Sequence, residues 1–261
     1  ITFFGPDNAD GNSVAIQPDG KIVVAGDEGV GTETRNFAIA RYNSDGFLDN
    51  NFGSDGKMTT HFATGNSQGF SVALQTDGKI VEAGVSYDGG NIDFALVRYN
   101  TDGTLDSSFG TGGKMTTDFG TGDDIGYSVA LQPDGKIVLV GDAYNGVDFD
   151  FALARYNTDG ALDNSFGTGG KVATDFGTGD DIAYSVAIQT DGKIVLVGES
   201  YNGVDFDFAL ARYDTDGTLD SSFGGNGKMT TAFGPNRDAG NSVAIQTDGK
   251  IVAAGVYLNG L

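Results

Sequence analysis

The chain has 261 residues, enough to bury a hydrophobic core, and it contains no cysteine and one histidine, His61. This composition excludes a disulfide scaffold, a cysteine-ligated metal site and a thiol nucleophile, and it leaves little room for histidine-based catalysis. Thirty-six acidic residues against 15 basic ones give a formal net charge of −21, which argues against nucleic-acid binding, and no apolar run is long enough for membrane insertion.

A sequence repeat organises the chain. The motif Ser-Val-Ala-(Ile/Leu)-Gln-x-Asp-Gly-Lys-Ile-Val begins at five serines whose spacings are 58, 57, 57 and 57 residues: Ser13, Ser71, Ser128, Ser185 and Ser242. No linker interrupts the series, so we expect a single domain over residues 1–261. Its units are residues 13–70, 71–127, 128–184, 185–241 and a fifth unit split between residues 242–261 and 1–12.

Each unit is predicted to contain four short strands, which the third unit illustrates. Residues 128–132 alternate between apolar and polar side chains, and an Asp-Gly turn returns the chain into residues 136–141 as a tight hairpin. Residues 151–157 and 171–176 are the predicted third and fourth strands. No window has the apolar period of a helix, and β-branched and aromatic residues dominate the strands. The sequence therefore predicts an all-β fold.

A four-stranded antiparallel unit of this length is typical of a β-propeller blade. A β-solenoid is the alternative, but its coils are shorter and lack hairpin turns. Residues 1–12 match residues 230–241 without a gap, so the chain is expected to open with a fourth-type strand and to close with the hairpin of residues 242–261. Propellers close their ring in this way. We expect five blades, or six to eight if the chain is part of a longer array.

The repeat resembles a known family. The segments SVALQPDGKIVLVGD and FALARYNTDGALDNSFG of the third unit are similar to the bacterial delta-60 repeat and, more distantly, to the NHL repeat. The resemblance covers nearly the whole chain and implies a propeller of a secreted or cell-surface bacterial protein. It brings no catalytic motif, so it supports the fold and the location rather than a particular chemistry.

Charges that recur in every unit are interpreted as parts of the frame. Arg155 shares a strand face with Phe151 and Leu153, so its stem is expected to pack between blades and its head to pair with Asp163 or a neighbouring carbonyl. Phe166 is expected to plug the corner that follows. Most of the unbalanced acids fall between the second and third strands and in the crossover to the next unit. Up-and-down topology places these connections at one end of a blade, where we expect an acidic, ligand-facing surface.

The acidic loops suggest a Ca²⁺ site, because carboxylates around glycines supply the hard oxygen ligands that this ion prefers. Asp148 and Asp150 are expected to project from one strand face. The spacing matches neither an EF-hand loop nor the glycine-rich calcium repeat, and a solvated acidic surface is the alternative. The candidate ligands are Asp118, Asp123, Asp124, Asp148, Asp150, Asp175, Asp180, Asp181, Asp205 and Asp207.

A glycan is the second predicted ligand. An aromatic side chain beside an amide or a carboxylate recurs in the connection between the second and third strands, where it could stack on a sugar and bind its hydroxyls. The same tyrosine could instead fold onto the edge of the blade, and Asn-Gly is also a turn sequence. The candidate residues are Tyr87, Asp88, Tyr144, Asn145, Tyr201 and Asn202.

These features predict a rigid, non-enzymatic binding or display module that takes Ca²⁺, a glycan or a protein on its acidic face. A purely structural or protein-interaction propeller without a small ligand is one alternative. A carboxylate-based enzyme acting on glycans is another, although carboxylate pairs can always be drawn among so many acids. His61 is interpreted as a surface variant, because the equivalent positions hold Asp118, Asp175 and Ala232.

Overall fold

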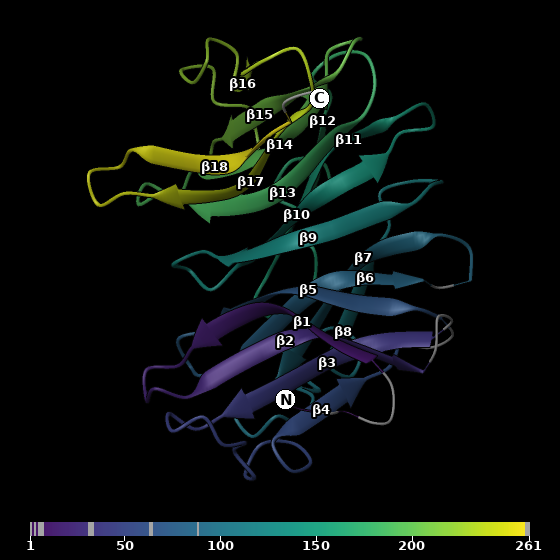
Figure 1. The fold of residues 1–261 in the computed structure, drawn as a ribbon, viewed down its shortest axis with the longest axis vertical. Helices are drawn as coiled ribbons and strands as arrows, with labels where there is room; N and C mark the ends of the chain where they lie inside the picture. Colours follow the sequence, from purple (N-terminus) through teal and green to yellow (C-terminus); the bar gives the residue numbers. More distant parts are fainter. Residues whose placement is uncertain are drawn as a thin grey trace. The chain divides into compact units, whose positions relative to one another are not determined.

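The computed structural model describes residues 2, 4, 8–30, 34–62, 65–87 and 89–258. Figure 1 shows the strands that these residues form. Four antiparallel sheets have four strands each, and a fifth has two. In the described part of the chain no helix is long and apolar enough to cross a membrane.

We name the sheets A to E in chain order. Sheet A contains β1 (Asn8–Ile16), β2 (Ile22–Val30), β3 (Thr34–Tyr42) and β4 (Lys57–Thr60). Sheet B contains β5 (Ser67–Leu74), β6 (Ile80–Tyr87), β7 (Ile92–Tyr99) and β8 (Lys114–Thr117). Sheet C contains β9 (Asp124–Leu131), β10 (Ile137–Tyr144), β11 (Phe149–Tyr156) and β12 (Lys171–Thr174). Sheet D contains β13 (Asp181–Ile188), β14 (Ile194–Tyr201), β15 (Phe206–Tyr213) and β16 (Lys228–Thr231). Sheet E contains β17 (Asp238–Ile245) and β18 (Ile251–Tyr257).

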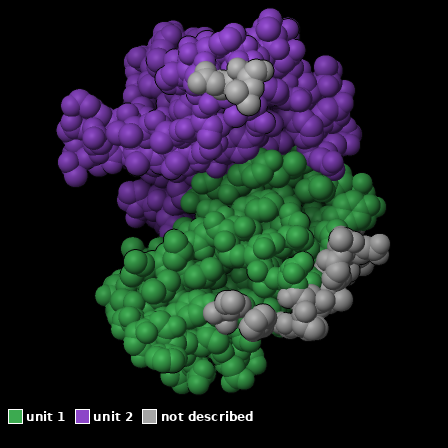
Figure 2. Space-filling view, viewed as in Figure 1, with its two compact units in different colours: residues 1–118, 124–129, 158–161 green, residues 119–123, 130–157, 162–261 purple. Residues whose placement is uncertain are grey.

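The chain divides into two compact units, coloured separately in Figure 2. Unit 1 comprises residues 1–118, 124–129 and 158–161, and unit 2 comprises residues 119–123, 130–157 and 162–261. Sheets A and B lie in unit 1. Sheets D and E lie in unit 2, together with most of sheet C, whose first strand begins in unit 1.

The Asp-Gly turns predicted between the first and second strands are confirmed. In sheet D, Gln189 and Lys193 close the turn with an N–H···O bond of 2.9 Å, and Gly192 adopts a φ of +86°. The carboxylate of Asp191 accepts a hydrogen bond from the backbone N–H of Lys193 at 3.1 Å. Glycine is required here because an L-residue rarely adopts this backbone conformation.

The first strands begin earlier than the repeat motif suggests. The third unit's first strand was predicted from residue 128, whereas β9 starts at Asp124. In the equivalent β13 of sheet D, a register shift between Ala183 and Ser185 allows residues before the motif to continue the ladder. For the same reason residues 8–12, which the sequence grouped with the split fifth unit, lie in β1 and pair with β2. The fourth strand of sheet C ends at Thr174, short of the predicted residue 176.

The register shift requires a glycine on the neighbouring strand. Gly198 of β14 pairs with Ala183, next to the shift, and the two backbones approach closely. A Cβ atom built on Gly198 would lie only 1.8 Å from the carbonyl oxygen of Ile182. No side chain fits in this space, so the glycine is a structural requirement of the sheet.

Packing between successive sheets forms the core. In unit 2, Val140 and Leu153 of sheet C join Ala183 and Leu196 of sheet D in one buried apolar cluster. Phe166 belongs to this cluster and is completely buried, which confirms its prediction as a plug. Because a strand has side chains on both faces, sheet D packs on sheet C through one face and on sheet E through the other, and its second strand is a nearly continuous apolar run.

The pairing expected for the head of Arg155 is confirmed. Its Nε donates to Asp163 Oδ2 at 2.8 Å, and its Nη1 donates to the carbonyl oxygen of Thr215, on the turn of the next sheet, at 2.5 Å. The guanidinium lies 4.3 Å from the ring centroid of Phe166. Lys136 adds an ion pair of 2.9 Å to the same carboxylate oxygen. The repeated arginine therefore fastens the corner of one sheet to the next sheet.

Thr2 and Phe4 make contacts that elsewhere belong to a fourth strand and the residues after it. The hydroxyl of Tyr42 donates to Thr2 Oγ1 at 2.6 Å, just as Tyr213 donates to Thr174 at 2.8 Å. Lys57 Nζ lies 5.7 Å from the ring centroid of Phe4, as Lys228 and its equivalents do over the phenylalanines that follow β12 and the other fourth strands. These contacts agree with the alignment of residues 1–12 on residues 230–241.

Glu82 is an acid in the core of unit 1, at a position that is Leu139 or Leu196 in other sheets. Its two carboxylate oxygens accept hydrogen bonds from the N–H of Gly26 and the hydroxyl of Tyr99, each at 3.1 Å. Complete burial raises the pKa of Glu82 well above its usual value, and these two hydrogen bonds oppose the rise only in part.

We expect the substitution Glu82→Gln to stabilise the protein at pH 8 and to have little effect at pH 4. The folded pKa of Glu82 is raised, so the wild type loses stability as the pH rises from the unfolded value through the folded one. Each pKa unit within that window is worth about 1.4 kcal/mol. Urea unfolding at both pH values measures the effect, with Glu28→Gln on the partly exposed part of β2 as the control. Equal destabilisation at both pH values would contradict the prediction.

Candidate cation site

Three carboxylates converge in unit 2 where sheet C leads into sheet D. Asp150 lies on β11, Asp175 directly follows β12, and Asp181 begins β13. One oxygen atom from each carboxylate lies within 4.8 Å of the other two. Antiparallel order places the start of a third strand, the end of a fourth strand and the crossover to the next sheet at the same end, which explains the convergence.

The two inner carboxylates of this cluster are buried and incompletely hydrogen-bonded. Asp181 is 0% exposed and Asp150 is 6% exposed, and Oδ1 of each has no hydrogen-bond partner among the residues that the structure describes. Their other oxygens are engaged: Asp181 Oδ2 accepts from the N–H of Phe176 at 2.7 Å, and Asp150 Oδ2 accepts from Asn145 Nδ2 at 2.9 Å. Asp175 is exposed and completes the cluster on the solvent side. A buried, unpaired carboxylate oxygen costs free energy unless a proton or a cation compensates it.

The pKa values of the buried aspartates reflect the closeness of the three carboxylates. Burial, together with the negative charges of Asp150 and Asp175, raises the pKa of Asp181 to about 6, although hydrogen bonds from Ser200 and Phe176 oppose the rise. Burial also raises the pKa of Asp150, and the charges of Asp175 and Asp148 add to this rise. Three carboxylates at this spacing repel one another, and a bound divalent cation would relieve that repulsion.

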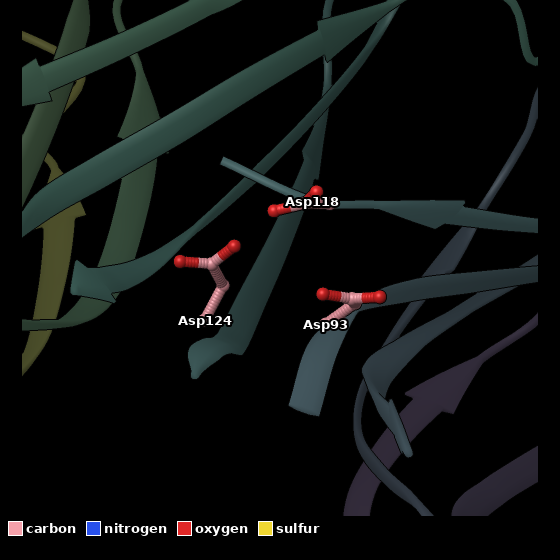
Figure 3. Close-up of side chains that lie close together, drawn as sticks. All are labelled: Asp93, Asp118 and Asp124. Atoms are coloured by element: carbon pink, nitrogen blue, oxygen red, sulfur yellow. The ribbon is translucent and has the colours of Figure 1, made fainter. Parts of the chain in front are cut away.

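Unit 1 contains the equivalent cluster one repeat earlier. Asp93 of β7, Asp118 after β8 and Asp124 at the start of β9 bring one oxygen each within 4.8 Å of the others. Figure 3 shows the three side chains grouped together from three separate segments. Asp93 and Asp124 are buried and Asp118 is exposed, the same pattern as in unit 2.

The remaining copies of the cluster lack some or all of the acids. In the first copy the three positions are Asn36, His61 and Ser67, and His61 Nδ1 shares a 2.7 Å hydrogen bond with Asn36 Oδ1. All three acids are therefore replaced together by neutral groups. In the fourth copy Asp207 and Asp238 remain buried, each with an unpartnered Oδ1, but the exposed third position is Ala232.

The other predicted ligands brace the loops around the clusters. Asp148 Oδ2 accepts a hydrogen bond from the N–H of Gly179 at 3.0 Å, and Asp180 Oδ1 accepts one from the N–H of Phe149 at 3.1 Å. Asp205 pairs with the side chain of Asn202 at 2.8 Å. Asp148 precedes β11 and lies outside the cluster, although its carboxylate and that of Asp150 both accept hydrogen bonds from Asn145 Nδ2.

Asp123 also lies outside the clusters, and its carbonyl oxygen accepts a hydrogen bond from the N–H of Tyr144 at 3.1 Å. Sequence reasoning missed Asp93. It occupies the position of Asp150 and Asp207 in the aligned repeat, so the alignment contained the information needed to include it.

The predicted glycan-binding residues of sheets C and D have internal contacts. The ring of Tyr144 lies 5.3 Å from that of Phe149, and Tyr201 lies 5.3 Å from Phe206. Asn145 donates to Asp148 and Asp150 through Nδ2, while its Oδ1 accepts from the N–H groups of Val147 and Asp148. These tyrosines therefore pack against the third strand of their own sheet, and the side-chain amide of Asn145 stabilises the loop before β11.

Asn202 repeats the contacts of Asn145 in sheet D, where its Nδ2 donates to Asp205 and Asp207. Tyr87 is 38% exposed and makes one wall of a 280 Å³ hollow in unit 1. Asp88 lies outside the described residues. Glycan binding by these six residues stays a prediction.

Repeating four-stranded antiparallel sheets of this kind define a β-propeller protein. A family model described as a domain of unknown function (DUF5122) beta-propeller matches residues 17–52, 75–109, 132–166 and 189–223, which is more than half of the chain. The chain belongs to this family. No curated protein matches it significantly.

Two solved structures share the fold. A protein of unknown function from Dyadobacter fermentans is 13% identical with a TM-score of 0.57, and the match covers 96% of this chain and 76% of that chain. A catalytically inactive virginiamycin B lyase from Staphylococcus aureus, solved with quinupristin, is 12% identical with a TM-score of 0.51, and the match covers 96% of this chain and 71% of that chain. At these identities the likeness shows the fold alone, and one of the two proteins is an enzyme.

Proposed function

We propose that the chain is a non-enzymatic binding module that holds Ca²⁺ at the cluster of Asp150, Asp175 and Asp181. The observation that carries the proposal is the unpartnered Oδ1 atom on each of the two buried members of the cluster. Ca²⁺ takes oxygen ligands in flexible geometry, and carboxylates on two strands and a crossover suit this requirement. By position, Asp93, Asp118 and Asp124 supply a second site of the same kind.

The ion would join successive sheets. Its ligands come from β11 and the end of β12 in sheet C and from β13 in sheet D, so one ion spans the crossover of residues 175–181. Fixing this crossover stiffens the loops around it, which is useful in a module that presents its loops to a ligand. Recurrence of one cluster in two units favours equivalent binding sites over a single active site. From the repeat resemblance we also propose a secreted or cell-surface location.

Isothermal titration with CaCl₂ tests the proposal. The wild type is expected to bind two equivalents of Ca²⁺, and Asp181→Asn, which removes a buried charge without changing the shape, is expected to bind one. Asp205→Asn is the matched control, because its carboxylate pairs with Asn202 outside both clusters. Circular dichroism confirms that each variant is folded. No heat of binding for the wild type, or two equivalents for Asp181→Asn, would overturn the proposal.

The fourth copy of the cluster allows a gain-of-function test. Ala232→Asp places a carboxylate at the exposed position beside the buried pair Asp207 and Asp238. We expect the stoichiometry to rise from two to three Ca²⁺ equivalents, because the variant restores the ligand set of the unit 2 cluster. Ala232→Asn adds a side chain of the same size without the charge and serves as the control. An unchanged stoichiometry in Ala232→Asp would show that the three carboxylates are not sufficient.

A further inference from the structure

The ligand count of the unit 2 cluster leaves a bound Ca²⁺ only partly coordinated. Asp150 Oδ2 and Asp181 Oδ2 already accept hydrogen bonds from Asn145 and Phe176, so each residue has one oxygen left for an ion. Asp175 Oδ1 accepts from the N–H of Gly177 at 2.5 Å and likewise leaves its other oxygen. The cluster therefore offers one oxygen per residue while it keeps its internal hydrogen bonds, whereas Ca²⁺ takes about six to eight.

The backbone oxygen of Asp175, the exposed member of the cluster, is already engaged. The carbonyl oxygen of Asp175 accepts a hydrogen bond from Lys228 Nζ at 2.7 Å, which directs this oxygen toward the lysine. The N–H groups of Phe176 and Gly177 are donors and cannot ligate a cation. The three carboxylate oxygens fill about half of the six to eight positions of Ca²⁺, so the other positions are open to water or to a ligand.

The open positions face the solvent. Asp150 and Asp181 are buried beneath the cluster, whereas Asp175 is exposed. An ion that touches all three residues consequently has protein on its inner side and water on the side of Asp175. Coordinated water exchanges readily and can be displaced by a ligand that supplies two oxygens at once.

Charge selects the kind of ligand. Three carboxylates around one Ca²⁺ leave a local formal charge of −1; the ammonium of Lys228 at the carbonyl oxygen of Asp175 offsets it, and the charge of Asp148 near Asp150 adds to it. The chain as a whole carries −21. A carboxylate or phosphate ligand would be repelled by this field, whereas neutral hydroxyl groups would not. Two adjacent hydroxyls of a sugar ring supply a pair of neutral oxygens that can chelate one ion.

We infer that Ca²⁺ at Asp150, Asp175 and Asp181 binds vicinal hydroxyl groups of a neutral glycan through its open coordination positions. This inference rests on the proposed function, because it requires the ion to be bound. It places the glycan on the ion rather than on Tyr144 and Tyr201, whose rings pack against Phe149 and Phe206.

Luminescence of Eu³⁺ bound in place of Ca²⁺ tests the coordination count on the full chain. Decay rates in H₂O and D₂O give the number of coordinated waters, and we expect about three or more. Methyl α-mannoside, methyl β-galactoside and methyl α-fucoside are then added in turn. At least one is expected to displace about two waters, while cyclohexanol, which has a single oxygen and cannot chelate, does not displace a pair.

Calorimetry with the same glycosides uses the protein with Ca²⁺ and with EDTA. We expect millimolar binding that requires Ca²⁺, whose stoichiometry Asp181→Asn lowers to about half because the unit 1 cluster remains, and that Asp205→Asn leaves unchanged. Ca²⁺ binding without any response to the glycosides would overturn this inference and leave the proposed function intact. Stronger binding of acetate or phosphate would overturn the selection for neutral ligands. Absence of Ca²⁺ binding would overturn the proposed function and this inference together.

Discussion

Gly198→Ala is expected to lower the free energy of unfolding by about 3 kcal/mol or more. The added methyl group would lie 1.8 Å from the carbonyl oxygen of Ile182, and no flexible side chain can move aside because both partners are backbone. Relief requires β13 and β14 to separate beside the register shift at Ala183, which breaks ladder hydrogen bonds. Urea unfolding followed by circular dichroism measures the loss.

Gly120→Ala provides the control for this prediction. Apart from its chain neighbours, the nearest atom to a Cβ at Gly120 would be the carbonyl oxygen of Tyr144, at an ordinary 3.9 Å, and the residue does not need a positive φ. We expect a change within about 0.5 kcal/mol of the wild type. Equal stability of the two variants would contradict the role assigned to the close backbone approach.

Asp163→Asn is expected to cost about 3–5 kcal/mol, because it leaves the buried guanidinium of Arg155 without its counter-charge. Asp163 is 5% exposed and pairs with both Arg155 and Lys136 through Oδ2. Asp134→Asn is the control: its side chain is 58% exposed and lies 3.8 Å from Lys136, so its loss should cost no more than about 0.5 kcal/mol. Similar losses in both variants would contradict the prediction.

The same substitution should change the response to acid. Burial would raise the pKa of Asp163, but hydrogen bonds from Ser165 and Lys136 and the charge of Arg155 outweigh it and hold the pKa well below its usual value. A lowered folded pKa gives stability that is present above the unfolded value, near 3.9, and is lost as the pH falls toward the folded one. Urea midpoints from pH 6 to pH 2 are expected to fall less steeply in Asp163→Asn than in the wild type.

The fold could be predicted because the same strand and turn pattern occurs several times in the chain. Asp-Gly turns, alternating strands and the Arg155–Asp163 pairing each follow from local rules, and five copies of one motif make an accidental pattern improbable. The strand bounds could not be predicted as well. The register shift beside Ser185 depends on Gly198, a residue of the next strand, and such a pairing is not visible in either segment by itself.

The site was harder to predict, because adjacent residues of a strand point to opposite faces. The sequence presents Asp180 and Asp181 as equal candidates. In the structure Asp181 enters β13 and turns into the cluster, whereas Asp180 remains outside and binds the N–H of Phe149. A shift of one residue would exchange their roles. The candidate ligands on the strands differ from the aspartates that hold the loops in how deeply they are buried. Composition contains no information on burial.

The corner contacts have a consequence for local opening within unit 2. Sheet C has its corner completed by sheet D, through the bonds of Arg155 to Thr215 and of Gly167 to Asp216. In the described part of the chain, Arg212 of sheet D keeps Asp220 but has no following carbonyl, and its side chain is 18% exposed against 7% for Arg155. Among the described residues, the corner of sheet C is therefore held to a neighbouring sheet by two bonds that the corner of sheet D lacks. Amide hydrogen exchange is expected to be slower at the corner of sheet C than at the corner of sheet D.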